Sequence, residues 1–183
     1  MIENLWAGWR DPYLSSLPER ARRDDKDGSQ SKEDPSVFTS ILRSGRPDEE
    51  TYILRRSDHV FVILNAFPYA VGHSMVLPYR QVADLDQLSA DESHDLWRMV
   101  TTLCRAVRRE YRPQGINIGV NLGSASGGSV HEHLHVHVVP RWAGDTNFLA
   151  VTANTKTIPE PLDVTAARLR AALCDIESDS EST

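Results

Sequence analysis

His133-Leu134-His135-Val136-His137-Val138-Val139 is a stretch that alternates strictly between imidazole and aliphatic side chains up to its last residue. Successive side chains of a β-strand point to opposite faces, so this pattern predicts a strand with imidazoles on one face and aliphatic groups on the other. We expect the aliphatic face to enter the core. The three imidazoles are then expected to stand in a row, about 6–7 Å apart along the strand.

Three interpretations of this histidine row compete. A polar outer face is the plainest, but three of the seven histidines of the chain fall within five residues, which disfavours it. A metal site is the second, because neutral imidazole is a common zinc ligand and a His-x-His pair can supply two ligands. The third is nucleophilic catalysis, in which a neutral imidazole nitrogen attacks phosphorus and a second nucleophile resolves the phosphoramidate.

A run of glycine and small residues, Gly123-Ser124-Ala125-Ser126-Gly127-Gly128-Ser129, lies just before the histidines. Its backbone N–H groups can approach an anion closely, and its hydroxyls can donate hydrogen bonds. Taken alone, such a run is more often a flexible loop. Its position directly before the histidine row favours a phosphate-binding role and therefore the catalytic interpretation.

The rest of the chain predicts a sheet and helices around this row. Apolar segments bounded by turn residues predict strands at residues 52–56, 59–65, 73–78 and 116–122. A helix is predicted over 89–111, because Ser89 and Glu92 have the spacing of a capping box and an apolar stripe follows. Shorter helices are predicted at 37–42 and 165–175. These elements predict an α+β fold, an antiparallel sheet with helices on one side.

Composition divides the chain into three expected parts. Residues 1–50 form an N-terminal extension, whose segment 20–35 is crowded with charged and small residues and is expected to be disordered. Residues 51–150 form the catalytic domain. Residues 151–183 form a helical segment that ends in an acidic, serine-rich tail, which we expect to be frayed.

Net charge and cysteine usage limit the possible function classes. The formal net charge of −6 disfavours general nucleic-acid binding, which needs a basic face, but it allows a small phosphorylated ligand. No apolar run approaches the ~18 residues of a membrane span, and the N-terminus has no signal-peptide pattern. We therefore expect a cytoplasmic protein with no membrane partner. Cys104 and Cys174 match no metal spacing and are expected to be buried free thiols.

With these residues identified, the chain resembles the histidine triad (HIT) family, whose signature is His-x-His-x-His followed by two apolar residues. Residues Asn65, Gly72-His73, Asn121 and 127–130 extend the resemblance over roughly residues 51–142. The opening residues 5–10 and the runs 132–142 and 144–148 are similar to the actinobacterial branch that contains diadenosine tetraphosphate phosphorylase. The resemblance implies a HIT-like fold and a homodimer with one continuous sheet, and the branch admits tetramers.

The resemblance also implies a reaction and the residues that perform it. The reaction is nucleotidyl transfer through a covalent histidine intermediate, above all phosphorolysis of diadenosine tetraphosphate to ATP and ADP. His135 is the expected nucleophile, His137 the donor to the phosphate oxygens, and His133 a support for the site. The other implied contacts are Asn121, Gly128, Ser129 (near the leaving group) and Arg141 to phosphate, Asn65 to ribose, Phe61 and Ile63 to adenine, and His73 in a supporting role.

Several of these assignments have plainer alternatives. Phe61 and Ile63 are equally consistent with core packing, His73 with a structural histidine, and Arg141 with a surface arginine. The partners expected are a small nucleotide and inorganic phosphate. No protein-bound metal or cofactor is expected, although magnesium can accompany the phosphates of the substrate. A hydrolase of dinucleoside polyphosphates or other nucleotide conjugates, and a nucleotide-binding regulator without chemistry, are the alternative functions.

Two departures from the family pattern refine the expectation. Gly128 stands where many hydrolases of the family carry glutamine or another polar residue, and we hypothesise that the space admits inorganic phosphate as the second nucleophile. The chain also lacks the polar residue, at a fixed spacing, that precedes the triad in the small phosphoramidase branch, because His131-Glu132 intervenes. This second departure weighs against phosphoramidase activity.

Overall fold

The structure is a computed structural model that describes residues 34–145 and 160–181. All of these except Asp34, Gly144 and Asp145 belong to one compact unit, Pro35–Ala143 with Ile158–Thr183, and the fold below is that unit. The expected disordered segment, apart from its last two residues, and the opening residues 5–10 lie outside the described residues. The division into three parts therefore stays a prediction. None of the described helices has the length and apolar character needed to cross a membrane.

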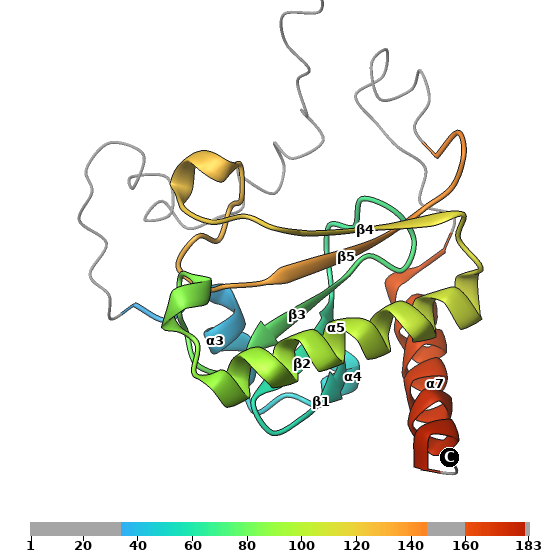
Figure 1. The fold of residues 1–183 in the computed structure, drawn as a ribbon, viewed down its shortest axis with the longest axis horizontal. Helices are drawn as coiled ribbons and strands as arrows, with labels where there is room; N and C mark the ends of the chain where they lie inside the picture. Colours follow the sequence, from blue (N-terminus) through green and yellow to red (C-terminus); the bar gives the residue numbers. More distant parts are fainter. Residues whose placement is uncertain (1–33, 146–159, 182–183) are drawn as a thin grey trace, which may run out of the picture. The chain divides into compact units, whose positions relative to one another are not determined.

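Five antiparallel strands form a single sheet in the order β1-β2-β3-β5-β4 (Figure 1). The strands are β1 (Ile53–Arg56), β2 (Val60–Leu64), β3 (Ser74–Pro78), β4 (Gly115–Val120) and β5 (Val136–Arg141). Each lies within three residues of the strand expected from the sequence. The α+β fold with an antiparallel sheet is thus confirmed.

The histidine stretch differs from the expected strand at its start. β5 begins at Val136, three residues later than expected, and continues to Arg141. His133 and His135 therefore precede the ladder and are free to turn toward other partners. The alternation of faces persists nevertheless, because Leu134, Val136 and Val138 all enter one core cluster.

The longest helix, α5 (Ala90–Tyr111), crosses one face of the sheet (Figure 1). Its capping box is present as predicted, with the Ser89 hydroxyl accepting from the Glu92 N–H and the Glu92 carboxylate accepting from the Ser89 N–H. The predicted apolar stripe is buried, and the helix ends just before Arg112 and Pro113. This helix and α7 cover the core cluster that contains one side of every strand.

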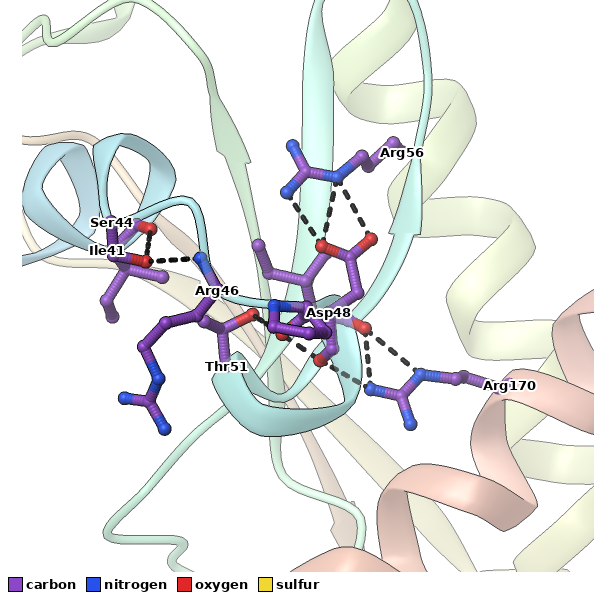
Figure 2. A network of polar contacts seen from close by, with 9 residues as sticks. Ile41, Ser44, Arg46, Asp48, Thr51, Arg56 and Arg170 are labelled. Carbon is purple, nitrogen blue, oxygen red and sulfur yellow. Dashed lines mark hydrogen bonds and ion pairs between the residues drawn. The ribbon is translucent and has the colours of Figure 1, made fainter.

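The C-terminal helix α7 (Leu162–Glu181) is longer at both ends than the segment expected from the sequence. Leu169 and Leu173 are buried against the same core cluster as α5. Arg170 of α7 donates to the backbone oxygens of Ile53 and Asp48, at 2.9 Å and 2.7 Å. Asp48 belongs to the short helix α4 (Asp48–Thr51), and Figure 2 shows it between Arg170 and Arg56. α7 is thereby fastened to the edge strand β1.

The opposite face of the sheet carries a smaller core cluster and the short helix α3 (Val37–Arg43). Phe38 of α3 packs there with Phe61 and Ile63 of β2 and with Leu77 of β3. The alternating side chains of β2 divide between the two clusters, as the two faces of a pleated strand require. α3 therefore lies on the face to which the imidazoles are directed. The other short elements are the 3₁₀ turns η2 (Leu85–Gln87) and η3 (Ser124–Ser126).

Candidate active site

His135, the middle histidine, is held in one tautomer by a backbone group. Its Nδ1 lies 2.8 Å from the backbone oxygen of His133. A carbonyl oxygen only accepts, so Nδ1 carries the proton and Nε2 keeps its lone pair in the neutral ring. The side chain is 5% exposed, and burial lowers its pKa below the ordinary value for histidine. Burial thus favours the uncharged imidazole, and the bonded carbonyl leaves Nε2 as its nucleophilic nitrogen.

His133 is fully enclosed and bonded at both ring nitrogens. Its Nε2 lies 2.9 Å from the backbone oxygen of Pro78, and its Nδ1 lies 2.7 Å from the hydroxyl of Ser36. Its ring meets Phe38 edge-on at 5.6 Å between centroids. The interpretation of the row as a polar outer face is therefore wrong for His133 and His135, which are both buried.

His137 is paired with His73, which immediately precedes β3. The Tyr69 N–H donates to Nδ1 of His73 at 3.0 Å, so Nε2 of a neutral His73 carries the proton. That Nε2 lies 3.0 Å from Nδ1 of His137. The His137 ring also lies edge-on to His135, with 4.7 Å between centroids. The rings form a compact cluster, closer than the evenly spaced row expected from the sequence.

The glycine-rich segment reaches this cluster through Asn121. The amide nitrogen of Asn121 lies 3.4 Å from Nε2 of His137. A Cβ placed on Gly128 would come within 3.1 Å of the Asn121 Cβ, so the loop returns to the end of β4. Gly127 has φ +83°, a left-handed conformation that suits glycine and allows this return. Ser129 is half-buried beside Val130, which enters the core cluster beneath α3.

Asn65, the expected ribose contact, lies beside His73, whereas Phe61 and Ile63, the expected adenine contacts, lie in a core cluster. The Asn65 amide nitrogen is 3.4 Å from both ring nitrogens of His73, and its oxygen accepts from the Phe67 N–H. Phe61 and Ile63 are 0% and 3% exposed and pack in the core beneath α3. Their burial favours the plainer alternative of core packing, whereas a ribose contact from Asn65 stays a prediction.

Arg141 lies away from the other expected phosphate ligands. It ends β5, four residues beyond His137, which corresponds to roughly 13 Å along a strand. Its guanidinium donates to the side-chain oxygen of Asn117 at 2.9 Å. This placement favours the surface arginine over a phosphate ligand.

Sequence reasoning missed the contribution of α3 to this site. Ser36 and Phe38 both contact His133, which is 97 positions from Ser36 along the chain. Ser36 precedes an apolar run, so it could have been identified as a helix N-cap, but no local pattern indicates its histidine partner.

The two cysteines also differ from expectation in part, because Cys104 is buried whereas Cys174 is exposed. Within residues 34–145 and 160–181, no group of three His, Cys, Asp or Glu side chains is arranged to hold a metal ion.

Comparison with known proteins gives the same family from sequence and from structure. The HIT domain family model matches residues 46–144. A Mycobacterium tuberculosis (strain H37Rv) protein named AP-4-A phosphorylase is 41% identical over 161 residues, covering 88% of this chain and 79% of that protein. A Saccharomyces cerevisiae bis(5'-adenosyl)-triphosphatase is 30% identical over 91 residues, covering 49% of this chain and 44% of that enzyme.

The fold has solved counterparts. A zinc-bound histidine triad family protein from Mycobacterium smegmatis has a TM-score of 0.64 and 26% identity, covering 78% of this chain and 96% of that one. A HIT-like protein from Bartonella henselae has a TM-score of 0.63 and 25% identity, covering 78% and 99%. The segment matched by the family model includes the sheet and α5 but neither α3 nor α7.

Proposed function

The chain belongs to the HIT domain family, and from this premise we propose that it transfers a nucleotidyl group through a covalent bond to His135. One observation carries the proposal. Nδ1 of His135 is fixed as a donor to the His133 carbonyl, and no hydrogen-bond partner lies at Nε2 among the described residues. A neutral imidazole with a bare Nε2 is the form that can attack phosphorus.

The substrate we propose is diadenosine tetraphosphate, and the reaction is phosphorolysis. The likeness to the M. tuberculosis protein named AP-4-A phosphorylase supports this choice, because it covers most of both chains. In the first step, Nε2 of His135 bonds to the α-phosphorus, the bridging P–O bond breaks, and ATP leaves with the electron pair. In the second step, an oxygen of inorganic phosphate bonds to the same phosphorus. The P–N bond then breaks, which restores the histidine lone pair and releases ADP.

The neighbouring residues support these steps. Once His137 accepts at Nδ1 from His73, its Nε2–H is a donor that can stabilise negative charge on the phosphoryl oxygens. Asn121 lies beside that Nε2, and Gly128 lies against Asn121, so the loop supplies further polar groups next to the histidines. We assign Ser129 to the leaving group and His133 to the support of His135. Magnesium, where present, belongs to the phosphates of the substrate.

A homodimer with one continuous sheet completes the proposal. β4 is an edge strand of the described sheet, and its Ile118 is 49% exposed. An exposed edge with an apolar side chain is a template for pairing with a second strand. Whether dimers associate into tetramers, and the cytoplasmic location, stay predictions from the sequence.

Product analysis tests the reaction. The purified protein is incubated with diadenosine tetraphosphate with and without inorganic phosphate, and the nucleotides are separated by chromatography. Phosphorolysis gives ATP and ADP only when phosphate is present. Release of AMP and ATP without phosphate would instead support the hydrolase, an alternative favoured by the likeness to the yeast triphosphatase. Turnover in neither condition would contradict both enzymes and leave the nucleotide-binding regulator.

A further inference from the structure

A buried hydrogen-bond network joins the first histidine of the triad to the start of α3. The Ser36 hydroxyl lies 2.7 Å from Nδ1 of His133, and Ser36, Thr39 and His133 are all buried. The side-chain oxygen of Gln81 accepts from the Ser36 N–H and from the Thr39 hydroxyl, both at 2.8 Å. α3 is thereby connected both to the histidine and to the segment that follows β3.

The direction of each hydrogen bond follows from the groups involved. Nε2 of His133 faces the carbonyl of Pro78, so it must carry a proton. Burial lowers the pKa of His133 and keeps the ring neutral, so Nδ1 has only a lone pair to offer. The single proton of the Ser36 hydroxyl is consequently directed to Nδ1 at 2.7 Å rather than to the Thr39 hydroxyl at 3.1 Å, while the Ser36 oxygen accepts from the Thr39 N–H at 3.1 Å.

The same histidine holds the nucleophile through its backbone. The peptide group between His133 and Leu134 is bonded at both polar atoms: its N–H donates to the Val82 carbonyl at 2.6 Å, and its oxygen accepts from Nδ1 of His135. The His133 ring is joined to this peptide group only through the Cβ and Cα of the same residue. Anchoring the ring at both nitrogens therefore also restricts the carbonyl that fixes the His135 tautomer.

We propose that Ser36 is a positioning residue for the nucleotidyl transfer. Its hydroxyl holds His133 in one tautomer and orientation, and the His133 carbonyl in turn holds His135 with its Nε2 lone pair available. Ser36 lies before the segment 46–144 that the family model matches. The kinetic consequence rests on the proposed function, but the tautomer of His135 does not depend on the identity of the substrate.

Four substitutions separate positioning from helix capping. Ser36→Ala removes the donor to His133 and also the N-cap of α3, whereas Ser36→Thr keeps a hydroxyl for both. Ser89→Ala is the matched control, because Ser89 caps α5 with the same kind of bond to Glu92 and its capping box involves no histidine. Ser36→Gly also lacks the hydroxyl but remains an acceptable N-cap residue, so it replaces Ser36→Ala if that variant does not fold.

The measurements are long-range ¹H–¹⁵N spectra of the imidazoles at neutral pH and steady-state kinetics with diadenosine tetraphosphate. The wild type, Ser36→Thr and Ser89→Ala should show His135 as the Nδ1–H tautomer. Ser36→Ala should show a mixture of tautomers and about a tenfold lower kcat, with KM changed by less than about twofold, because misplacing a reacting group affects the chemical step.

Two results would overturn the positioning role. One is an unchanged His135 tautomer and kcat in Ser36→Ala. The other is an equal loss of kcat in Ser89→Ala, which would make the effect one of helix stability. If the tautomers respond as expected but the wild type turns over no dinucleotide, the positioning role is supported while the proposed function fails.

Discussion

Nε2 of His73 lies 3.0 Å from Nδ1 of His137, so two histidines 64 positions apart share one hydrogen bond. The direction of this bond is set by a third group, the N–H of Tyr69, which donates to the other nitrogen of His73. The Tyr69 ring also lies 4.6 Å from the His73 ring, between centroids. The Tyr69 N–H therefore fixes the tautomer of a neutral His73, and His73 in turn fixes the tautomer of a neutral His137. The Nε2–H of His137 then faces the end of β4.

Replacing His73 should impair the chemical step more than substrate binding. His73→Phe keeps a planar ring but removes the donor to His137 and the acceptor for Tyr69. We expect kcat to fall by about 10- to 100-fold, since His137 loses its fixed tautomer, and KM to change little. Steady-state kinetics and a thermal melt check this result, the melt because the Tyr69 N–H loses its hydrogen bond to His73.

His73→Gln is the matched control for this change. Glutamine has an amide that can donate to His137 and an oxygen that can accept from Tyr69. It should therefore recover part of the kcat lost in His73→Phe. Equal kcat values for the wild type and His73→Phe would show that His73 is a structural histidine only.

Removing the proposed nucleophile should abolish turnover without unfolding the chain. His135→Ala deletes the only ring whose Nδ1 is bonded to the His133 carbonyl in the described residues. We expect a loss of about three orders of magnitude in kcat, as for other deleted nucleophiles, together with a wild-type-like circular dichroism spectrum. The acid-labile nucleotide adduct trapped on the wild type should be absent. An adduct of equal yield on the variant would show that a residue other than His135 forms the covalent bond.

Acid should affect activity and stability in the same direction. Burial lowers the pKa of His133 and of His135 below the ordinary 6.5. The unfolded chain takes up these protons near 6.5, whereas the folded chain does so only at lower pH, so the unfolded state binds more protons in that interval. The contribution of these two uncharged imidazoles to the free energy of unfolding should be fully present above about pH 6.5. It should be lost as the pH decreases toward their folded pKa values.

The acidic limb of kcat/KM should likewise lie below pH 6.5, because His135 must be uncharged to attack. A pH–rate profile and urea midpoints between pH 4.5 and 8, about the range over which histidine titrates, measure both effects. His135→Ala should show a weaker loss of stability in acid, since one of the two buried imidazoles is gone. An acidic limb above 6.5 would mean that a different group controls the reaction.

Periodicity predicted most of the fold but not the geometry of the triad. Every strand and the long helix follow from apolar alternation, capping and turn residues, because those signals lie within a few positions of one another. The start of β5 is different. His133 and His135 alternate as a strand would, yet His133 bonds to Ser36 and to the Pro78 carbonyl, and these partners lie far along the chain. Whether His133 and His135 pair within the sheet or bond through their side chains is therefore decided by contacts that form only in the folded chain.

The sequence likewise predicted some residues of the site and missed others. The three triad histidines, His73 and Asn121 lie together, since the sequence pattern predicted them on three strands whose counterparts β3, β5 and β4 are neighbours in the sheet. Arg141 lies four residues further along β5 and bonds to Asn117 instead. Ser36 carries no signal beyond that of a helix cap, because its importance depends on a histidine that the fold brings to it.

Enlarging Gly128 should affect phosphorolysis more than hydrolysis. A Cβ at this position would come within 3.1 Å of the Asn121 Cβ, so any side chain there crowds Asn121. Gly128→Gln adds a polar side chain where we place inorganic phosphate, and we expect it to lower phosphate-dependent cleavage by about tenfold more than cleavage by water. Rates of ADP and AMP formation, measured in one assay, give the ratio.

Gly128→Ala separates crowding from occupation of the phosphate site. It introduces the same Cβ beside Asn121 without the amide, so it should lower both reactions to a similar extent. A Gly128→Gln variant that loses both reactions equally, as Gly128→Ala is expected to do, would contradict a phosphate site at this position.

Charging the exposed edge strand should dissociate the proposed dimer. Ile118 is 49% exposed on β4, and a glutamate there would place two like charges close together across a paired edge. We expect the wild type to have about twice the chain mass of 20.5 kDa in light scattering, and Ile118→Glu to approach the mass of one chain. Val164→Glu is the control, because Val164 is 42% exposed on α7 rather than on the strand edge. If both variants keep the wild-type mass, or if the wild type is already a monomer, the continuous sheet across two copies is wrong.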